Sequence, residues 1–202
     1  MKFIPTHLQG AYIIDIEALE DSRGFFARTW CQEEFQQHGI DMSPVQMSVS
    51  HNALEGTLRG LHFQWPPSLE AKLVRCQRGR VYDVIVDLRP DSATFTGFVA
   101  VELDSRKHNA LYVPPGFAHG FQTLEANSDI TYMMSTAFRP ELADGLRYND
   151  PQFEIDWPLP VSCILDRDRD YPNFNKNDYS QRYFQALKAT NNASSAHQDK
   201  GK

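Results

Sequence analysis

The sequence contains few cysteines, and their spacing suggests neither a metal site nor a disulfide framework. Its 202 residues include three cysteines, which lie far apart at Cys31, Cys76 and Cys163. No Cys-x-x-Cys pair is present for zinc binding or dithiol chemistry, and an odd number does not fit a small secreted scaffold. We therefore expect buried free thiols in a reducing cytoplasm.

The sequence also lacks a long apolar run and a cluster of basic residues. Nowhere do 18 apolar residues follow one another, so no membrane span is predicted. The first seven residues, Met1 to His7, lack the apolar core of a signal peptide. The formal net charge is −6 and there is no basic run, so neither nucleic acid nor an anionic membrane is expected as a partner.

Helical periodicity is scarce, whereas short apolar segments separated by turn residues recur along most of the chain. This pattern predicts an all-β sandwich or barrel with a few short helices, at residues 33–38 and 175–187. Residues 11–16 read as one edge strand and residues 25–30 as an aromatic strand. We expect a single domain over residues 1–188 and a polar, disordered tail over residues 189–202.

Polar groups are concentrated in the central block, residues 56–89. Three strand-like segments there are separated by Pro66-Pro67 and by Gly79. Alternation within residues 81–88 places Asp83 and Asp87 on one face of an otherwise apolar strand. A carboxylate in that position either meets solvent or is buried with a partner. The nearby groups that could serve as partners are His62, Lys72 and Arg59.

Part of a cupin metal motif is present, but the ligand set is incomplete. A later histidine follows a turn in Pro114-x-Gly116-x-x-His119. The earlier histidine, His62, is followed two residues later by Gln64 where a second imidazole would stand, and Glu70 lies beyond two prolines. Two imidazoles and an amide bind a transition metal poorly, so we expect no metal.

His62 and Lys72 are better candidates for proton chemistry. A histidine suits a general base near neutral pH, and a lysine among apolar neighbours could stabilise an oxyanion. Each residue taken alone is more often structural, as a hydrogen-bonded core histidine or an edge lysine. Arg59 and a possible acid, Tyr132, shift the balance toward function. Arg23 and Arg59 each precede a glycine, which would let a guanidinium approach a phosphate closely.

Longer motifs in the chain resemble those of the dTDP-4-dehydrorhamnose 3,5-epimerases. The resemblance runs from about residue 10 to residue 175 and rests on Asp21-x-Arg23-Gly24-x-Phe26, Gly56-x-Leu58-Arg59-Gly60-Leu61-His62-Phe63-Gln64, Lys72-Leu73-Val74, Asp83-Val84-x-Val86-Asp87-Leu88-Arg89, Ser92-x-Thr94-Phe95, Pro115-Gly116-Phe117-Ala118-His119-Gly120-Phe121, Asn149-Asp150-Pro151 and Trp157-Pro158. It implies a cupin-type jelly roll, a homodimer, no metal or cofactor, and a nucleotide-diphosphate sugar with a 4-keto-6-deoxyhexose as substrate.

The resemblance also implies a role for each matching residue. The base falls on His62, the enolate-stabilising lysine on Lys72, the acid on Tyr132 and the carboxylate that orients the base on Asp168. Two neighbouring aspartates make the register at Asp168 ambiguous. The substrate contacts fall on Arg23, Phe26, Gln46, Arg59 and His119, and Phe138 lies where a tyrosine usually stacks on the nucleotide base.

Three positions depart from the family pattern, and all of them concern the ligand. Ser48 stands where asparagine is usual, Arg28 replaces a common glutamate near the nucleotide, and Phe138 lacks the tyrosine hydroxyl. The expected activity is inversion of C3 and C5 of dTDP-4-dehydro-6-deoxy-D-glucose, a cytoplasmic step of dTDP-rhamnose and polysaccharide biosynthesis. The alternatives are inversion at C3 or C5 alone on a dTDP-, CDP- or GDP-sugar, and a nucleotide-sugar binding protein without catalysis.

Overall fold

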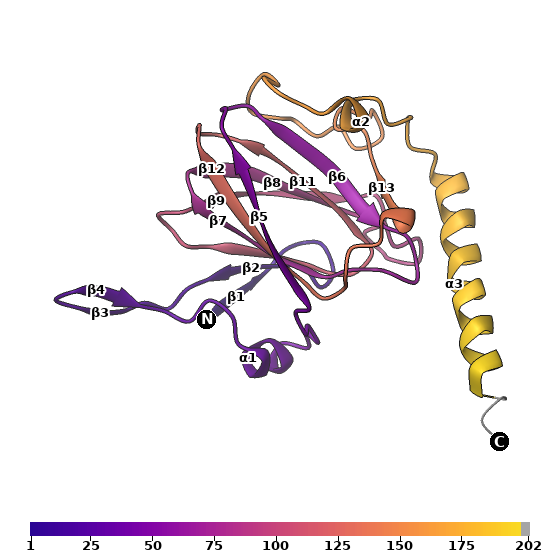
Figure 1. Cartoon of the computed structure of the whole chain (residues 1–202), viewed down its shortest axis with the longest axis horizontal. Coiled ribbons are helices and arrows are strands. Elements are labelled where there is room, and N and C mark those ends of the chain that lie inside the picture. The colour runs from indigo at the N-terminus through magenta and orange to yellow at the C-terminus, as the bar shows by residue number, and fades with distance from the viewer. Residues whose placement is uncertain (199–202) are drawn as a thin grey trace.

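Two antiparallel β-sheets pack face to face in a computed structural model that describes residues 1–198 (Figure 1). The six-stranded sheet has the order β1 (Lys2–Pro5), β2 (Tyr12–Asp15), β10 (Ala110–Val113), β7 (Lys72–Arg78), β12 (Ser128–Met134) and β5 (Gln46–Asn52). The five-stranded sheet has the order β13 (Ala143–Gly145), β6 (Leu58–Gln64), β11 (Phe117–Thr123), β8 (Arg80–Asp87) and β9 (Phe98–Asp104). Neighbouring strands are mostly far apart in the sequence, as in a jelly roll. The predicted all-β cupin-type fold is confirmed.

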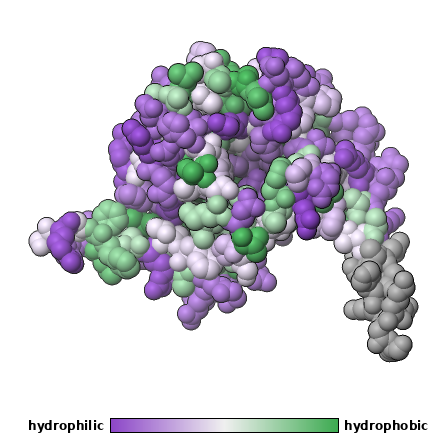
Figure 2. Space-filling model, viewed as in Figure 1, coloured by the Kyte–Doolittle hydropathy of each residue, from purple (hydrophilic) through white to green (hydrophobic). Residues whose placement is uncertain are grey.

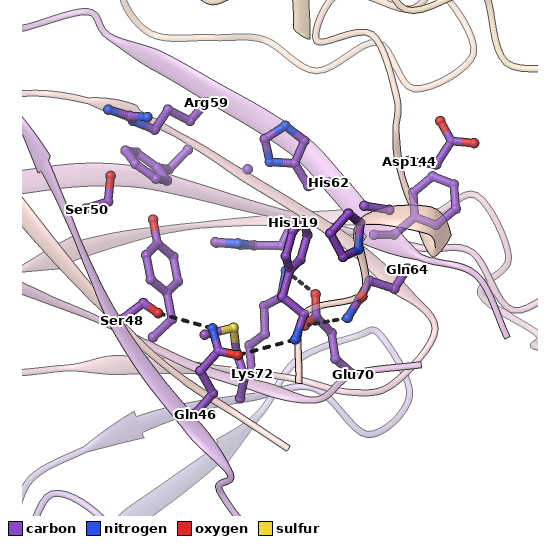
Figure 3. Close-up of a pocket in the computed structure, with 18 of the residues that line it drawn as sticks. Gln46, Ser48, Ser50, Arg59, His62, Gln64, Glu70, Lys72, His119 and Asp144 are labelled. Carbon is purple, nitrogen blue, oxygen red and sulfur yellow. Dashed lines mark hydrogen bonds and ion pairs between the residues drawn. The ribbon is translucent and has the colours of Figure 1, made fainter. Parts of the chain in front are cut away.

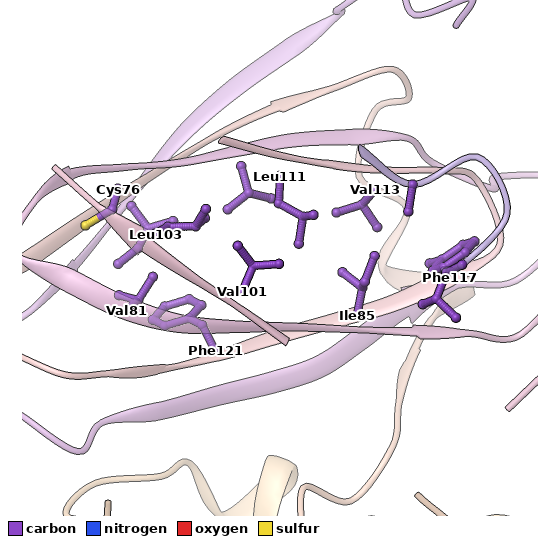
Figure 4. Packing of buried hydrophobic residues seen from close by; sticks show 13 residues of the cluster. Cys76, Val81, Ile85, Val101, Leu103, Leu111, Val113, Phe117 and Phe121 are labelled. Atoms are coloured by element: carbon purple, nitrogen blue, oxygen red, sulfur yellow. The ribbon is translucent and has the colours of Figure 1, made fainter. Parts of the chain in front are cut away.

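The main core fills the space between the two sheets. Strand β8 contributes Val81 and Ile85 to this core, while Val84 and Val86 belong to a second cluster on the other side of the sheet (Figure 4). The alternation predicted for residues 81–88 is therefore correct. Burying each such aliphatic side chain stabilises the fold by about 1.5–3 kcal/mol.

The two aspartates of β8 are buried, but their partners are not those expected from the sequence. Asp83 hydrogen-bonds His119, and Asp87 pairs with Arg89 and accepts the hydroxyls of Ser92 and Thr94. The expectation that His62, Lys72 or Arg59 would pair with them is wrong. The reason is the register between β8 and β11. His119 of β11 is paired with Ile85 of β8, which is two residues from Asp83.

The N-terminal region differs from the single edge strand that the sequence predicted. Strands β1 and β2 form a hairpin in which β1 is the edge and β2 pairs with β10. The predicted aromatic strand over residues 25–30 is shorter, because β4 (Gly24–Phe26) pairs only with β3 (Leu19–Asp21). This small hairpin extends away from the sheets (Figure 1). After it, the chain returns to the outer face of the six-stranded sheet, where Trp30 packs.

The helices are few and lie outside the sandwich. Helix α1 (Gln32–Gln37) ends before Gly39, which has a positive φ of 72° as predicted for a helix end. Helix α2 (Asp166–Arg169) is a single turn, and η1 (Pro140–Leu142) is a short 3-10 helix. Helix α3 (Lys176–Gln198) begins one residue after the start of the predicted segment 175–187 and continues beyond residue 188, where the domain was expected to end. Of the predicted tail, residues 199–202 lie outside the described part.

The cysteines are free but only partly buried. Cys76 is buried, Cys31 is half-buried and Cys163 is exposed. The expectation of buried thiols is therefore wrong for Cys163, which follows a loop that reaches the sheet through a single bridge to Thr57. Within residues 1–198, no helix is both long and apolar enough to cross a membrane.

Candidate active site

One end of the sandwich contains an open pocket of about 650 Å³. Figure 3 shows polar side chains from both sheets pointing into it, with Arg59 and Ser50 at one end and Gln64 and Glu70 at the other. Seven of the ten residues predicted as site residues line this pocket: Gln46, Arg59, His62, Lys72, His119, Tyr132 and Phe138. The structure thus brings together groups that are separated by up to 92 residues in the chain.

His62 is held by a buried carboxylate from the C-terminal part of the chain. Its Nε2 lies 2.8 Å from Oδ1 of Asp168, which is on α2 and 106 residues away in sequence. The backbone N–H of Gly60 donates to the other oxygen of Asp168 at 3.1 Å. A neutral imidazole that donates from Nε2 carries its lone pair on Nδ1, so His62 can accept a proton at that atom.

Asp168 is distinguished from its two acidic neighbours by burial. Its side chain is 3% exposed, whereas those of Asp166 and Asp170 are exposed and pair with Arg169. Burial by itself would raise the pKa of Asp168. Hydrogen bonds from His62, Gly60 and Arg167 outweigh that effect, so the pKa lies below its ordinary value and the carboxylate is ionised beside the imidazole.

Lys72 enters the pocket from β7 and forms an ion pair with Glu70. The Nζ–Oε1 distance is 2.8 Å, and both side chains are nearly buried, at 11% and 9% exposure. The other oxygen of Glu70 accepts the Gln64 amide at 3.1 Å. Alternation along β7 places Lys72 on the face of Val74 and opposite Leu73, and Val74 and Leu73 accordingly belong to different clusters.

Tyr132 enters from β12 in the opposite sheet to His62. Its ring packs against the main core and makes an edge contact with His119, with ring centroids 5.9 Å apart. Burial raises the pKa of Tyr132, and the negative charge of Asp83 raises it further. A hydrogen bond with Ser50 and the charge of Arg59 act in the other direction but are weaker. The phenol is therefore protonated at neutral pH and can donate a proton.

Positive charge lies at the rim of the pocket. Arg59 is exposed, and its guanidinium is anchored by Asn52 Oδ1, which accepts from Nε at 2.7 Å. Arg167, also exposed, donates to Asp168 and approaches His62 Nε2 to 3.2 Å. Two guanidinium groups at the mouth of a pocket suit an anionic ligand such as a diphosphate. The sequence reasoning missed Arg167, although it adjoins Asp168 directly.

The glycine after Arg59 allows strands β6 and β11 to pack closely. Gly60 has a φ of 102°, and a Cβ built on it would lie 2.7 Å from the Cα of Gly120 on β11. The same close approach between β6 and β11 places the Gly60 N–H against Asp168. The packing of β6 against β11 therefore requires glycine at this position.

Of the three predicted site residues that do not line the pocket, Asp168 reaches it through its hydrogen bond to His62, whereas Arg23 and Phe26 do not contact it. Both are on the β3–β4 hairpin, and neither is among the residues that line the cavity. Arg23 is exposed and pairs with Asp21 at 2.6 Å. Arg28, one of the departures from the family pattern, also lies away from the pocket and pairs with Glu34.

Strand β5 turns its polar face to the pocket and its apolar face outward. Gln46, Ser48 and Ser50 line the cavity, whereas Met47 and Val49 are 64% and 67% exposed. Ser48 contributes a hydroxyl 3.4 Å from the Gln46 amide, so the departure from asparagine keeps a polar group in place. The alternation of residues 46–50 was visible in the sequence, but it could not show that the face with Ser50 lines the pocket.

The side chains that would complete a cupin metal site are otherwise occupied. Gln64 and Glu70 hydrogen-bond each other, and Glu70 pairs with Lys72. Among the residues that the structure describes, no three His, Cys, Asp or Glu side chains are grouped as metal ligands.

Comparison with known proteins identifies close relatives over most of the chain. The family model described as dTDP-4-dehydrorhamnose 3,5-epimerase matches residues 5–176. A dTDP-4-dehydrorhamnose 3,5-epimerase from Methanothermobacter thermautotrophicus is 37% identical over 179 residues, which cover 87% of this chain and 96% of that protein.

Solved structures agree with the sequence comparison. A dTDP-4-dehydrorhamnose 3,5-epimerase from Bacillus anthracis with TDP and PPi bound has a TM-score of 0.83 and 37% identity, covering 86% of this chain and 99% of its own. A 3'-monoepimerase from Streptomyces bikiniensis in complex with dTDP-quinovose has a TM-score of 0.80 and 28% identity, covering 94% and 97% of the two chains.

Proposed function

The chain belongs to the dTDP-4-dehydrorhamnose 3,5-epimerase family, and we propose that it inverts both C3 and C5 of dTDP-4-dehydro-6-deoxy-D-glucose. As a member of that family it is an epimerase of 4-keto-6-deoxy sugars. The product would be dTDP-4-dehydro-L-rhamnose. The proposal concerns the substrate, the number of centres inverted and the role of each residue.

The chemistry that the pocket must support is proton transfer next to a ketone. The C4 carbonyl of the sugar acidifies the hydrogens on C3 and C5, because either carbanion is delocalised onto the carbonyl oxygen as an enolate. The ketone of the substrate is itself the electron sink, so the reaction needs a base, an acid and a cation near the oxygen. No cofactor is required by this scheme.

His62 is the proposed base. Its Nε2 is held by ionised Asp168, which leaves Nδ1 to accept the proton and stabilises the imidazolium that forms. Lys72 is the proposed partner of the enolate oxygen, because its ammonium is nearly buried and interacts strongly with charge that develops nearby.

Tyr132 is the proposed acid, and its position is the observation that carries the proposal. Inversion requires that the proton return from the opposite face of the sugar ring. His62 is on β6 of one sheet and Tyr132 on β12 of the other, and both line the same pocket. A sugar ring held between the sheets would have the base on one face and the phenol on the other.

The remaining pocket residues would bind the nucleotide. Arg59 and Arg167 provide positive charge for the diphosphate, and His119 and Gln46 provide hydrogen-bonding groups for the sugar and phosphate. Phe138 is 54% exposed beside the pocket, which suits stacking on a nucleotide base that also remains accessible to solvent.

The decisive experiment is incubation with dTDP-4-keto-6-deoxyglucose in deuterated water, followed by NMR of the sugar. Deuterium at C3 and C5 with L-configured product supports the proposal. Deuterium at C3 alone would replace it with single-centre epimerisation, the activity named for one of the similar structures. Deuterium at neither carbon would leave a binding protein or a different nucleotide, to be separated by repeating the reaction with CDP- and GDP-sugars.

We also propose a homodimer that acts in the cytoplasm. Apolar side chains are exposed on the outer face of β5 and on the β3–β4 hairpin, where Leu19 and Phe26 are 71% and 73% exposed (Figure 2). A second copy would cover these surfaces, and its hairpin could then bring Arg23 and Phe26 to a neighbouring pocket. Sedimentation of the wild type and of a Val49→Lys variant tests this, and a wild type that is monomeric at micromolar concentration would overturn it.

A further inference from the structure

Glu70 is a buried carboxylate in the pocket that the proposed chemistry does not use. We propose that Glu70 is a positioning residue, which holds Lys72 as an ammonium with its Nζ fixed for the enolate oxygen. This inference rests on the proposed function, because it concerns how Lys72 carries out its role. It is argued from the hydrogen bonds that connect Gln64, Glu70 and Lys72.

The hydrogen bonds around Glu70 suit a carboxylate that accepts from two donors. The backbone N–H of Arg139 donates to Gln64 Oε1 at 2.7 Å, which fixes the orientation of that amide. The Gln64 NH2 group must then face Glu70, where Oε2 accepts from it at 3.1 Å. The second oxygen of Glu70 lies 2.8 Å from Lys72 Nζ. Both carboxyl oxygens therefore face a group that can donate, the Gln64 amide at one and the Lys72 nitrogen at the other.

Glu70 is the counter-charge that lies against Lys72 in the pocket. The other charged or titratable side chains facing the pocket are Arg59 and His62 of β6, His119 of β11, Tyr132 of β12, Asp144 of β13, and Arg167 and Tyr171 from the 166–171 region. The other pocket carboxylate, Asp144, binds Trp65 Nε1 and pairs with Arg182. Among the described residues, Glu70 is the one carboxylate paired with Lys72, and the two arginines would repel an ammonium.

The arrangement leaves Lys72 free to act on the substrate. An ammonium has three protons, and one directed at Glu70 leaves two for an oxygen in the pocket. Because Glu70 is itself anchored to Gln64 and through it to the backbone, the ion pair also restrains the long lysine side chain. Gln64 and Glu70 occupy positions at which a cupin metal motif would have ligands. In this chain the two side chains hold a lysine instead.

The test is the pH dependence of deuterium incorporation by Glu70→Gln, which removes the charge and preserves the shape. Activity that needs the Lys72 ammonium is lost as pH rises. The negative charge of a neighbouring Glu70 favours the ammonium and so extends activity to higher pH. We expect the alkaline limb of the kcat profile to move to lower pH by at least about one unit. The acid limb should keep its position, and the Kd for dTDP should stay within about twofold of the wild-type value.

Gln64→Met is the matched control, because it removes the anchoring amide but keeps the carboxylate. We expect a lower kcat at every pH with the alkaline limb unmoved. Should Glu70→Gln not fold, as judged by circular dichroism, Glu70→Asp takes its place, with a smaller displacement in the same direction. An unmoved alkaline limb in the folded variant, or a uniform loss at every pH, would overturn the inference. A wild type that incorporates no deuterium would instead overturn the proposed function.

Discussion

His62 and His119 are paired directly across β6 and β11, and each hydrogen-bonds its own carboxylate. Their surroundings differ in one respect that decides their roles. The His62 side chain is 36% exposed toward the pocket, whereas that of His119 is 4% exposed and its partner Asp83 is fully buried. Only His62 has space for a carbon acid to approach its free nitrogen, so His62 is the better candidate for the base.

Replacing His62 by alanine is expected to abolish deuterium incorporation while the protein still binds dTDP, because the proposed diphosphate contacts are at Arg59 and Arg167. The loss should be at least about 10²-fold, the lower range for a positioned base. Exchange can be followed by NMR and binding by calorimetry. Wild-type exchange rates in the purified variant would show that the base is elsewhere.

Tyr132→Phe separates proton exchange from inversion. The base can remove and return a proton on one face, which exchanges the isotope without changing configuration. We expect a folded variant that still incorporates deuterium, more slowly, but forms little or no L-configured sugar. The ring packing against the core is kept and only the hydroxyl is lost. Epimerised product at near wild-type speed would make Tyr132 a structural residue.

Exhaustive chelation is expected to leave activity unchanged. The reason is that Gln64 and Glu70 are engaged with each other and with Lys72. Turnover is measured before and after dialysis against a chelator, with a zinc-dependent enzyme dialysed alongside to show that the treatment works. Activity that disappears and returns with zinc, iron or manganese would contradict this prediction.

Asp87→Asn should lower the free energy of unfolding by about 2 kcal/mol at pH 7 and by less at pH 3. Burial opposes ionisation of Asp87, but Arg89, Ser92 and Thr94 donate to it and hold its pKa below the ordinary value. A depressed pKa stabilises the folded state above the unfolded pKa of about 4, and this contribution is lost as pH falls through the folded pKa. Denaturant unfolding at both pH values measures it, and an equal effect at both would contradict it.

Thiol titration at pH 8 should distinguish the cysteines. Burial raises the pKa of Cys76 to about 11, so its thiol is protonated and inaccessible at that pH, whereas Cys163 is exposed. We expect an aromatic disulfide reagent to modify Cys163 rapidly and Cys76 only after unfolding. Cys163→Ser provides the control, because it should remove the rapid phase. A rapid phase that survives this substitution and is lost in Cys76→Ser would refute the prediction.

The fold class and most of the pocket residues could be predicted from the amino-acid sequence. Alternation along residues 81–88 assigned Val81 and Ile85 to a different face from Val84, because a strand turns successive side chains to opposite sides whatever surrounds it. The motifs around His62, Lys72 and His119 pointed to residues that do line one cavity. Alternation is a local property of the chain and can be inferred from neighbouring residues, whereas the motifs were assigned through the family resemblance.

The partner of each polar side chain became clear only from the three-dimensional structure. The alternation of side chains along a strand predicts the face of Asp83 but not its hydrogen-bond partner. That partner is His119, because of the register between β8 and β11. It likewise could not show that β5 turns its apolar residues outward or that Arg23 lies on a hairpin away from the pocket. Pairing across a sheet joins residues that are distant in the chain, and the free energy that selects it comes from packing the whole sandwich.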